Sequence, residues 1–164
     1  MSFELSFENL EIYQQWVQSL PPALQWLAVI FLGMVPYVEI HFAAIAGIVS
    51  GINPAVSIPL AMFGNFIIVL LCVLLADKFN SRFGKDDEKL SPKRQKFNKN
   101  FEKYGVIGTS LFGWLVLPSS ITSFFMITAA KVSKQKVILW MGVSIITWGT
   151  ILAIVVLLFN TIII

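Results

Sequence analysis

The chain has 164 residues, of which 57% are hydrophobic and only 13% are charged, and its formal net charge is +3. Together with a mean hydropathy of +0.79, this composition excludes an ordinary soluble domain and indicates an integral membrane protein. The charge is unevenly placed, because residues 1–77 contain no lysine or arginine and residues 78–103 contain nine of the twelve basic side chains.

The first predicted element is an acidic amphipathic helix that ends before Pro21. Its apolar stripe consists of Leu10, Tyr13, Val17 and Leu20. Secretion signals begin with basic residues, whereas glutamates precede the first apolar run of this chain. We therefore expect the N-terminal segment to be retained and to lie at the membrane surface.

The apolar run over residues 24–50 is broken by Pro36, and it contains Glu39 and the only histidine, His41. Proline lacks a backbone N–H and disfavours helix at the residue before it. About twelve residues lie on each side of the break, and a helix of that length spans roughly 18 Å of a hydrocarbon core roughly 30 Å thick. The run therefore favours a re-entrant helical hairpin, although a tilted, kinked helix could also cross the membrane.

The next apolar run, over residues 55–76, is unbroken and long enough to cross the membrane. We expect it to be a full transmembrane helix. Asn65 lies near its middle, and Thr147 and Trp148 lie at a similar depth in the last apolar run. Such side chains line a cavity or join helices.

A basic segment over residues 78–103 follows this span. A serine and a proline at positions 91 and 92 are typical of a helix start, and aromatic residues then form an apolar stripe. We expect a helix over residues 91–104 on the inner membrane surface, where its stripe leaves no face for nucleic acid. Anionic lipid headgroups are the expected contacts of five basic side chains: Lys93, Arg94, Lys96, Lys99 and Lys103. A simple topology anchor is the alternative role.

The second half of the chain repeats this pattern. A run over residues 105–130 is broken by Pro118, and an unbroken run covers residues 137–164. FLGMVP at the first break is echoed by FGWLVLP at the second. Four hydroxyl side chains follow the second proline, namely Ser119, Ser120, Thr122 and Ser123. They could bind substrate or satisfy the carbonyl groups of a broken helix.

The lysine positions favour hairpins over full spans. If all four apolar runs crossed the membrane, the three lysines within residues 131–136 would face away from the basic segment, against the positive-inside rule. Hairpins place both basic segments in the cytoplasm. The predicted fold is an all-α integral membrane protein: an inverted repeat of two re-entrant helical hairpins plus two full transmembrane helices, with amphipathic interfacial helices. It forms one membrane domain whose half repeats are residues 1–77 and 104–164.

Glu39 is the acidic residue that the apolar runs enclose away from their ends. Because burial disfavours the charged form of a carboxyl group, such a group can exchange protons near neutral pH, and we expect Glu39 to couple transport to protons. A structural carboxyl group that closes the hairpin tip is the alternative. His41 shares a side with Glu39 only in an extended chain, where it could donate to Glu39 or to a phosphate-like ligand. A satisfied structural histidine is equally compatible with the sequence.

The stretch PYVEIHFAAIAGIVSGINPAVSIPLAMFGN, residues 36–65, resembles the small multi-drug export family, a branch of the wider DedA/VTT superfamily. Glu39 matches a Pro-x-x-Glu signature, and the Asn-Pro turn and the Gly-Asn pair ending at Asn65 match the rest of the pattern. The chain departs from the pattern at His41, where the family usually has arginine, and after Pro118, where SSITS stands in place of a glycine-rich motif.

The resemblance implies a dimer-prone transporter with opposed re-entrant hairpins, and relatives in the superfamily are associated with moving undecaprenyl phosphate or other lipids. No arginine lies near the second break, which weakens the case for an anion site there. We expect the substrate site to combine Pro36, Asn65 and Pro118 with the four hydroxyl side chains of the second break.

The leading hypothesis is a proton-coupled secondary transporter in a prokaryotic plasma membrane. Its expected substrate is an amphipathic small molecule or a lipid carrier, and its expected partners are membrane lipids and a second copy or a larger membrane complex. A non-transporting accessory subunit is the alternative. An intramembrane hydrolase ranks third because no nucleophile motif surrounds the serines, so we expect no enzyme activity. One histidine and one cysteine give no convincing ligand set, and we expect no metal or cofactor.

Overall fold

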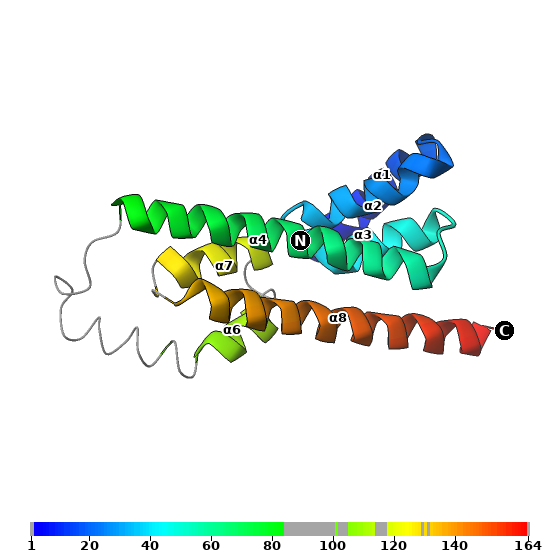
Figure 1. Ribbon diagram of the computed structural model, residues 1–164. Coiled ribbons are helices and arrows are strands. Elements are labelled where there is room, and N and C mark those ends of the chain that lie inside the picture. The colour runs from blue at the N-terminus through cyan, green and yellow to red at the C-terminus, as the bar shows by residue number, and fades with distance from the viewer. Residues whose placement is uncertain are drawn as a thin grey trace. The chain divides into compact units, whose positions relative to one another are not determined.

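The structure is a computed structural model, and it describes residues 2–83, 101, 105–113, 118–128, 130 and 132–163. Its helices, in chain order (Figure 1), are α1 (Ser2–Ser19), α2 (Pro22–Met34), α3 (Glu39–Val49), α4 (Pro54–Phe83), α6 (Val106–Phe112), α7 (Ser119–Thr128) and α8 (Lys134–Ile163). The described residues contain no strand, so the all-α prediction is confirmed for this part of the chain.

The chain forms two compact units. The first consists of Met1–Phe66 and Ile145–Ile164, and the second consists of Ile67–Ser144. Both boundaries fall inside long helices, α4 and α8. The predicted halves, residues 1–77 and 104–164, describe a repeat in the sequence and stay a prediction.

Proline residues set both ends of α2 in the first unit. Pro22 occupies the first turn, where the missing N–H would have no helical partner, and the carbonyl group of Pro21 accepts hydrogen bonds from the backbone N–H groups of Leu24 and Gln25. The helix stops at Met34, and Val35 is extended, with φ −73° and ψ 124°. Because Pro36 follows, this extended backbone is the conformation expected of the residue before a proline.

Helix α3 folds back on α2 to make a helical hairpin. The two helices stay in contact far from the break at Pro36. An added Cβ atom on Gly47 of α3 would lie 2.8 Å from Cγ2 of Val29 in α2. Gly51, with φ +96°, ends α3 in a Schellman motif, since the N–H of Ile52 donates to the carbonyl group of Gly47 at 3.0 Å. With 13 and 11 residues, α2 and α3 measure roughly 20 and 16 Å.

Helix α4 crosses α2 with the two backbones in contact. A Cβ atom on Gly33 of α2 would lie 2.5 Å from the carbonyl oxygen of Ala61, and one on Gly64 of α4 would collide with the carbonyl oxygen of Ile30. Only glycine allows this approach at either position. Close crossings between small residues are typical of helices packed in membranes.

Two helices are long and apolar enough to cross a membrane. In α4 the range is Pro54–Ala76, with 23 residues, and in α8 it is Lys134–Phe159, with 26 residues. Both coincide with the predicted full spans. Helices α2, α3 and α7 are shorter apolar helices, as half-crossings require, but their re-entrant placement and the inverted repeat stay predictions.

The second unit contains a short helical pair, α6 and α7. Helix α6 has 7 residues and α7 has 10. An added Cβ atom on Gly113, directly after α6, would lie 3.1 Å from Cγ2 of Thr122, so the end of α6 packs on the first turns of α7. The predicted interfacial helix over residues 91–104 lies outside the described residues.

Candidate functional site

The break between α2 and α3 carries strained backbone. Tyr37 has φ 71° and Glu39 has φ 49°, and both values fall in the left-handed region that bulky residues rarely adopt. Such positions cost about 1–3 kcal/mol each and gather at functional sites. The side chain of Tyr37 is 71% exposed, so its own packing does not offset the strain.

Both predicted proton-coupling residues belong to the start of α3. Glu39 is the first residue of the helix and is half-buried, and His41 is its third residue. Their spacing of two places them on different sides of a regular helix, although the left-handed backbone at Glu39 departs from helical geometry. The extended backbone that would place Glu39 and His41 on the same side of the chain is therefore not observed, because both residues belong to a helix.

Asn65 of α4 closes the broken end of α2. Its side chain is 2% exposed, and its Nδ2 donates a hydrogen bond of 3.4 Å to the carbonyl group of Gly33. This carbonyl group lies in the last turn of α2, where helical carbonyl groups lack backbone partners. The structure therefore brings Asn65 to the hairpin end that also holds Pro36 and Glu39, and their shared role in a substrate site stays a prediction.

The ring of His41 contacts the indole of Trp148 in α8. The ring centroids are 6.0 Å apart and the planes make an angle of 66°, an edge-to-face geometry that is favourable for aromatic pairs. Trp148 is thus a neighbour of the candidate site. Its depth in the last apolar run was the signal in the sequence, but the sequence could not identify its partner.

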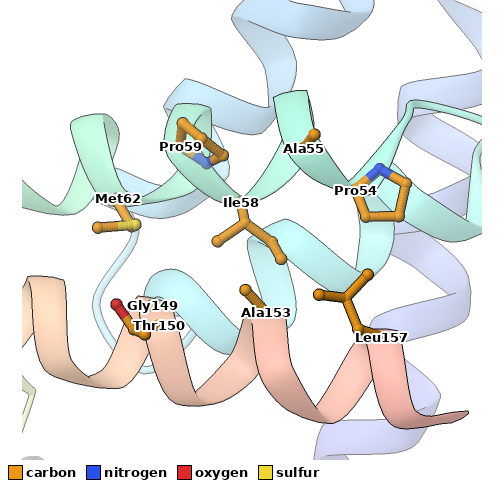
Figure 2. A pocket seen from close by; sticks show the side chains of 9 residues that line it. All are labelled: Pro54, Ala55, Ile58, Pro59, Met62, Gly149, Thr150, Ala153 and Leu157. Atoms are coloured by element: carbon orange, nitrogen blue, oxygen red, sulfur yellow. The ribbon is translucent and has the colours of Figure 1, made fainter.

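An apolar cavity of about 320 Å³ lies between the two long helices within the first unit (Figure 2). Ile58 and Met62 of α4 point toward α8, and Leu157 of α8 points toward α4. The full lining is Pro54, Ala55, Ile58, Pro59, Met62, Gly149, Thr150, Ala153 and Leu157. Sequence reasoning missed this cavity, because none of its lining residues carries a charge.

The second break, in the second unit, has a different character. All four predicted hydroxyl residues are buried, and Pro118 immediately precedes them at the start of α7. The hydroxyl group of Ser123 donates to the carbonyl group of Ser120 at 2.8 Å, which is the structural role that the sequence left open. Ser110 of α6 is also buried, and its hydroxyl group has no hydrogen-bond partner among the described residues.

The predicted lipid contacts and the expected absence of a metal both stay predictions. The five basic residues expected to contact anionic lipids, Lys93, Arg94, Lys96, Lys99 and Lys103, all lie outside the described residues. Within the part of the chain that the structure describes, no group of three histidine, cysteine or acidic side chains could hold a metal ion.

A family model described as "Putative small multi-drug export protein" matches residues 39–151. The matched range begins at Glu39 and includes Asn65, Trp148 and the second break, but it leaves out Pro36 and Tyr37 of the first break. Searches of the curated proteins and of the solved structures each found no match. Together with the two long apolar helices, the family match identifies a membrane protein. Because the match covers more than half of the chain, the protein belongs to the family of small multi-drug export proteins.

Proposed function

We propose that this protein is a proton-coupled secondary transporter that exports an amphipathic compound across a prokaryotic plasma membrane. The observation that carries the proposal is Glu39: a half-buried carboxyl group on a strained hairpin tip between apolar helices. Ionisable groups placed among apolar helices are costly and usually functional. The family name supports export as the direction of transport.

The proposed coupling rests on competition for one carboxyl group. Glu39 binds either a proton or the substrate, because carboxyl groups enclosed by apolar helices commonly mark proton and ion pathways. The edge-to-face contact between His41 and Trp148 ties α3 to α8, so His41 positions the hairpin that carries Glu39. Release of a proton from Glu39 then becomes linked to the occupancy of the site.

The proposal includes the predicted topology. Two re-entrant hairpins related by an inverted repeat would place Pro36, Asn65 and the residues from Pro118 to Ser123 on the path of the substrate. The lengths of α2, α3 and α7 support half-crossings. The basic segment over residues 78–103 would lie in the cytoplasm against anionic lipids, and two copies would form a dimer.

A specific observation also favours the second candidate function, a non-transporting accessory subunit. Several embedded polar side chains donate to backbone carbonyl groups: Asn65 to Gly33, Ser57 to Ala44 and Ser123 to Ser120. Side chains used in this way hold helices together without binding any substrate. An accessory subunit would need only these contacts.

Reconstitution into liposomes with an imposed pH gradient separates the two functions. The wild-type chain should drive accumulation of an amphipathic compound, and Glu39→Gln should abolish accumulation without a loss of folded protein. Glu11→Gln is the matched control, because Glu11 is an exposed glutamate of α1 outside the apolar hairpin. Full activity of the Glu39→Gln variant contradicts proton coupling. Absence of flux together with stoichiometric co-purification of a larger complex identifies an accessory subunit.

A further inference from the structure

The charges of the first unit have one sign. The sequence ranges that form it, residues 1–66 and 145–164, contain four glutamates and no lysine or arginine, whereas all twelve basic residues belong to residues 67–144. Of the four glutamates, Glu39 alone lies in the hairpin. An anionic headgroup would find no permanently cationic side chain in this unit, whereas a cation would find a carboxylate.

The cavity of the first unit is suited to an apolar group. Its one hydroxyl side chain, Thr150, donates to the carbonyl group of Ile146 at 2.8 Å, so the hydrogen atom of that hydroxyl is already used. The remaining lining side chains are apolar (Figure 2). The volume of about 320 Å³ falls at the lower end of the range of small-molecule pockets, which is roughly 300–1,000 Å³.

One wall of the cavity can adapt its shape. An added Cβ atom on Gly149 would collide with the sulfur atom of Met62, so the Met62 side chain rests directly on the backbone of α8. Methionine is unbranched and polarisable, and it accommodates groups of different shape. A cavity with this wall can accept apolar groups that are not identical.

Helix α8 lines the cavity and also contacts the acidic hairpin within the first unit. Gly149 follows Trp148 in α8, and Trp148 contacts His41 in α3, the helix that begins with Glu39. An amphipathic molecule needs both an apolar pocket and a charged partner. The first unit contains both of them.

We infer that the cavity between α4 and α8 binds the apolar part of an amphipathic organic cation, and that the positive charge of this compound pairs with Glu39. The inference rests on the proposed function and names its substrate class. It favours a lipophilic cation over a lipid phosphate, because the unit that holds the cavity offers a carboxylate and no lysine or arginine.

Two probe ions of the same shape and opposite charge test whether the site prefers a cation. Tetraphenylphosphonium and tetraphenylborate have the same four phenyl groups and opposite charges. The purified full-length protein in detergent should bind the cation saturably and should not bind the anion. Glu39→Gln should weaken binding of the cation. Equal binding of both ions, or saturable binding of farnesyl phosphate in place of the cation, overturns the assigned substrate class.

Variants on opposite walls test the cavity. Ala153→Phe and Ala55→Phe fill it from α8 and from α4, and each should weaken tetraphenylphosphonium binding by at least about tenfold, since even one misfitting methylene group in a pocket costs about tenfold or more. Ile154→Phe is the control, because Ile154 is next to Ala153 but 51% exposed and outside the lining. It should bind as tightly as the wild type. Size-exclusion profiles confirm that each variant is folded.

The outcomes separate this inference from the proposed function. If both filling variants fold and still bind the cation as the wild type does, the cavity is not its site, even where Glu39→Gln abolishes proton-driven flux. If the filling variants lose cation binding and no compound is transported by the wild type, the binding site stands and the transport proposal fails.

Discussion

The two polar breaks of the chain start from one sequence pattern, an apolar run interrupted by proline, and differ in chemistry. At the break between α2 and α3 the backbone is strained, a carboxyl group is half-buried, and an amide from α4 donates to the end of α2. At the start of α7 the polar side chains are uncharged and buried, and Ser123 bonds within its own helix.

This difference shows that a shared pattern does not give a shared role. A hydroxyl group that donates to a carbonyl group of its own helix is satisfied within that helix, so it needs no hydrogen-bond partner from a ligand or another helix. A carboxyl group on a left-handed backbone is costly unless a ligand, a proton or another group stabilises it. In the proposed mechanism, energy coupling therefore belongs to the first break, and the second break contributes to the substrate path without coupling it to protons.

The largest expected effect is on transport. Glu39→Gln should reduce proton-driven flux to background, whereas the double variant Ser119→Ala, Ser120→Ala should keep its proton dependence and lose about 3- to 10-fold in apparent affinity, the value of one hydrogen bond. Flux assays at several pH gradients and substrate concentrations measure both. Proton-independent flux in the serine variant, or unchanged flux in the glutamine variant, reverses the assignment of the two breaks.

The second effect is on stability. Gly64→Ala should destabilise the protein by about 1–3 kcal/mol, because the new methyl group collides with the carbonyl group of Ile30 in α2. Gly108→Ala in α6 is the matched control, since an added Cβ atom there meets nothing within 4 Å. It should stabilise by about 0.5–1 kcal/mol, because alanine is the better helix former. Thermal unfolding in detergent, followed by circular dichroism, measures both, and equal effects would refute the backbone contact.

The next prediction compares a hydrogen bond between two helices with a hydrogen bond inside one helix. Asn65→Ala leaves the carbonyl group of Gly33 without this donor in a buried position and should cost about 1–3 kcal/mol. Ser123→Ala removes a bond to a carbonyl group within its own helix and should cost about 0.5–1 kcal/mol. The same unfolding experiment ranks them. A larger loss for the serine variant would mean that the second break depends more on its polar bonds than the first.

The smallest effect concerns strain. Tyr37→Gly should leave stability unchanged or raise it by up to about 1 kcal/mol, because relief of a left-handed backbone is partly offset by the greater freedom of the unfolded chain. Tyr37→Ala keeps a Cβ atom and should gain nothing. The difference in unfolding temperature between these two variants isolates the backbone contribution, and a glycine variant less stable than the alanine variant would exclude strain at this position.

Local chemistry was enough to predict where helices break and which runs could span. The ring of Pro36 disfavours helical backbone at Val35, so the end of α2 could be predicted from two neighbouring residues. The two long spans follow from uninterrupted apolar composition. The left-handed conformation of Tyr37 was beyond prediction, because local preference alone would place glycine there.

The site was predicted less completely, for a physical reason. Glu39 and Asn65 could be selected from the sequence because polar groups in apolar runs are costly wherever they pack. The contact between His41 and Trp148 and the apolar cavity depend on which helix faces meet, and that information is spread over many residues far apart in the chain. Small residues four positions apart, Gly149 and Ala153, were the one sequence signal for the cavity.

The interlocked glycines of α2 and α4 limit how this protein can move. With Gly33 seated against Ala61 and Gly64 against Ile30, a slide of one helical turn, roughly 5.4 Å, would push larger side chains into the space that the glycines leave. Helix α2 and the part of α4 that contacts it are therefore expected to move together as one rigid body. Any motion of the hairpin relative to other helices therefore has its hinge outside this contact.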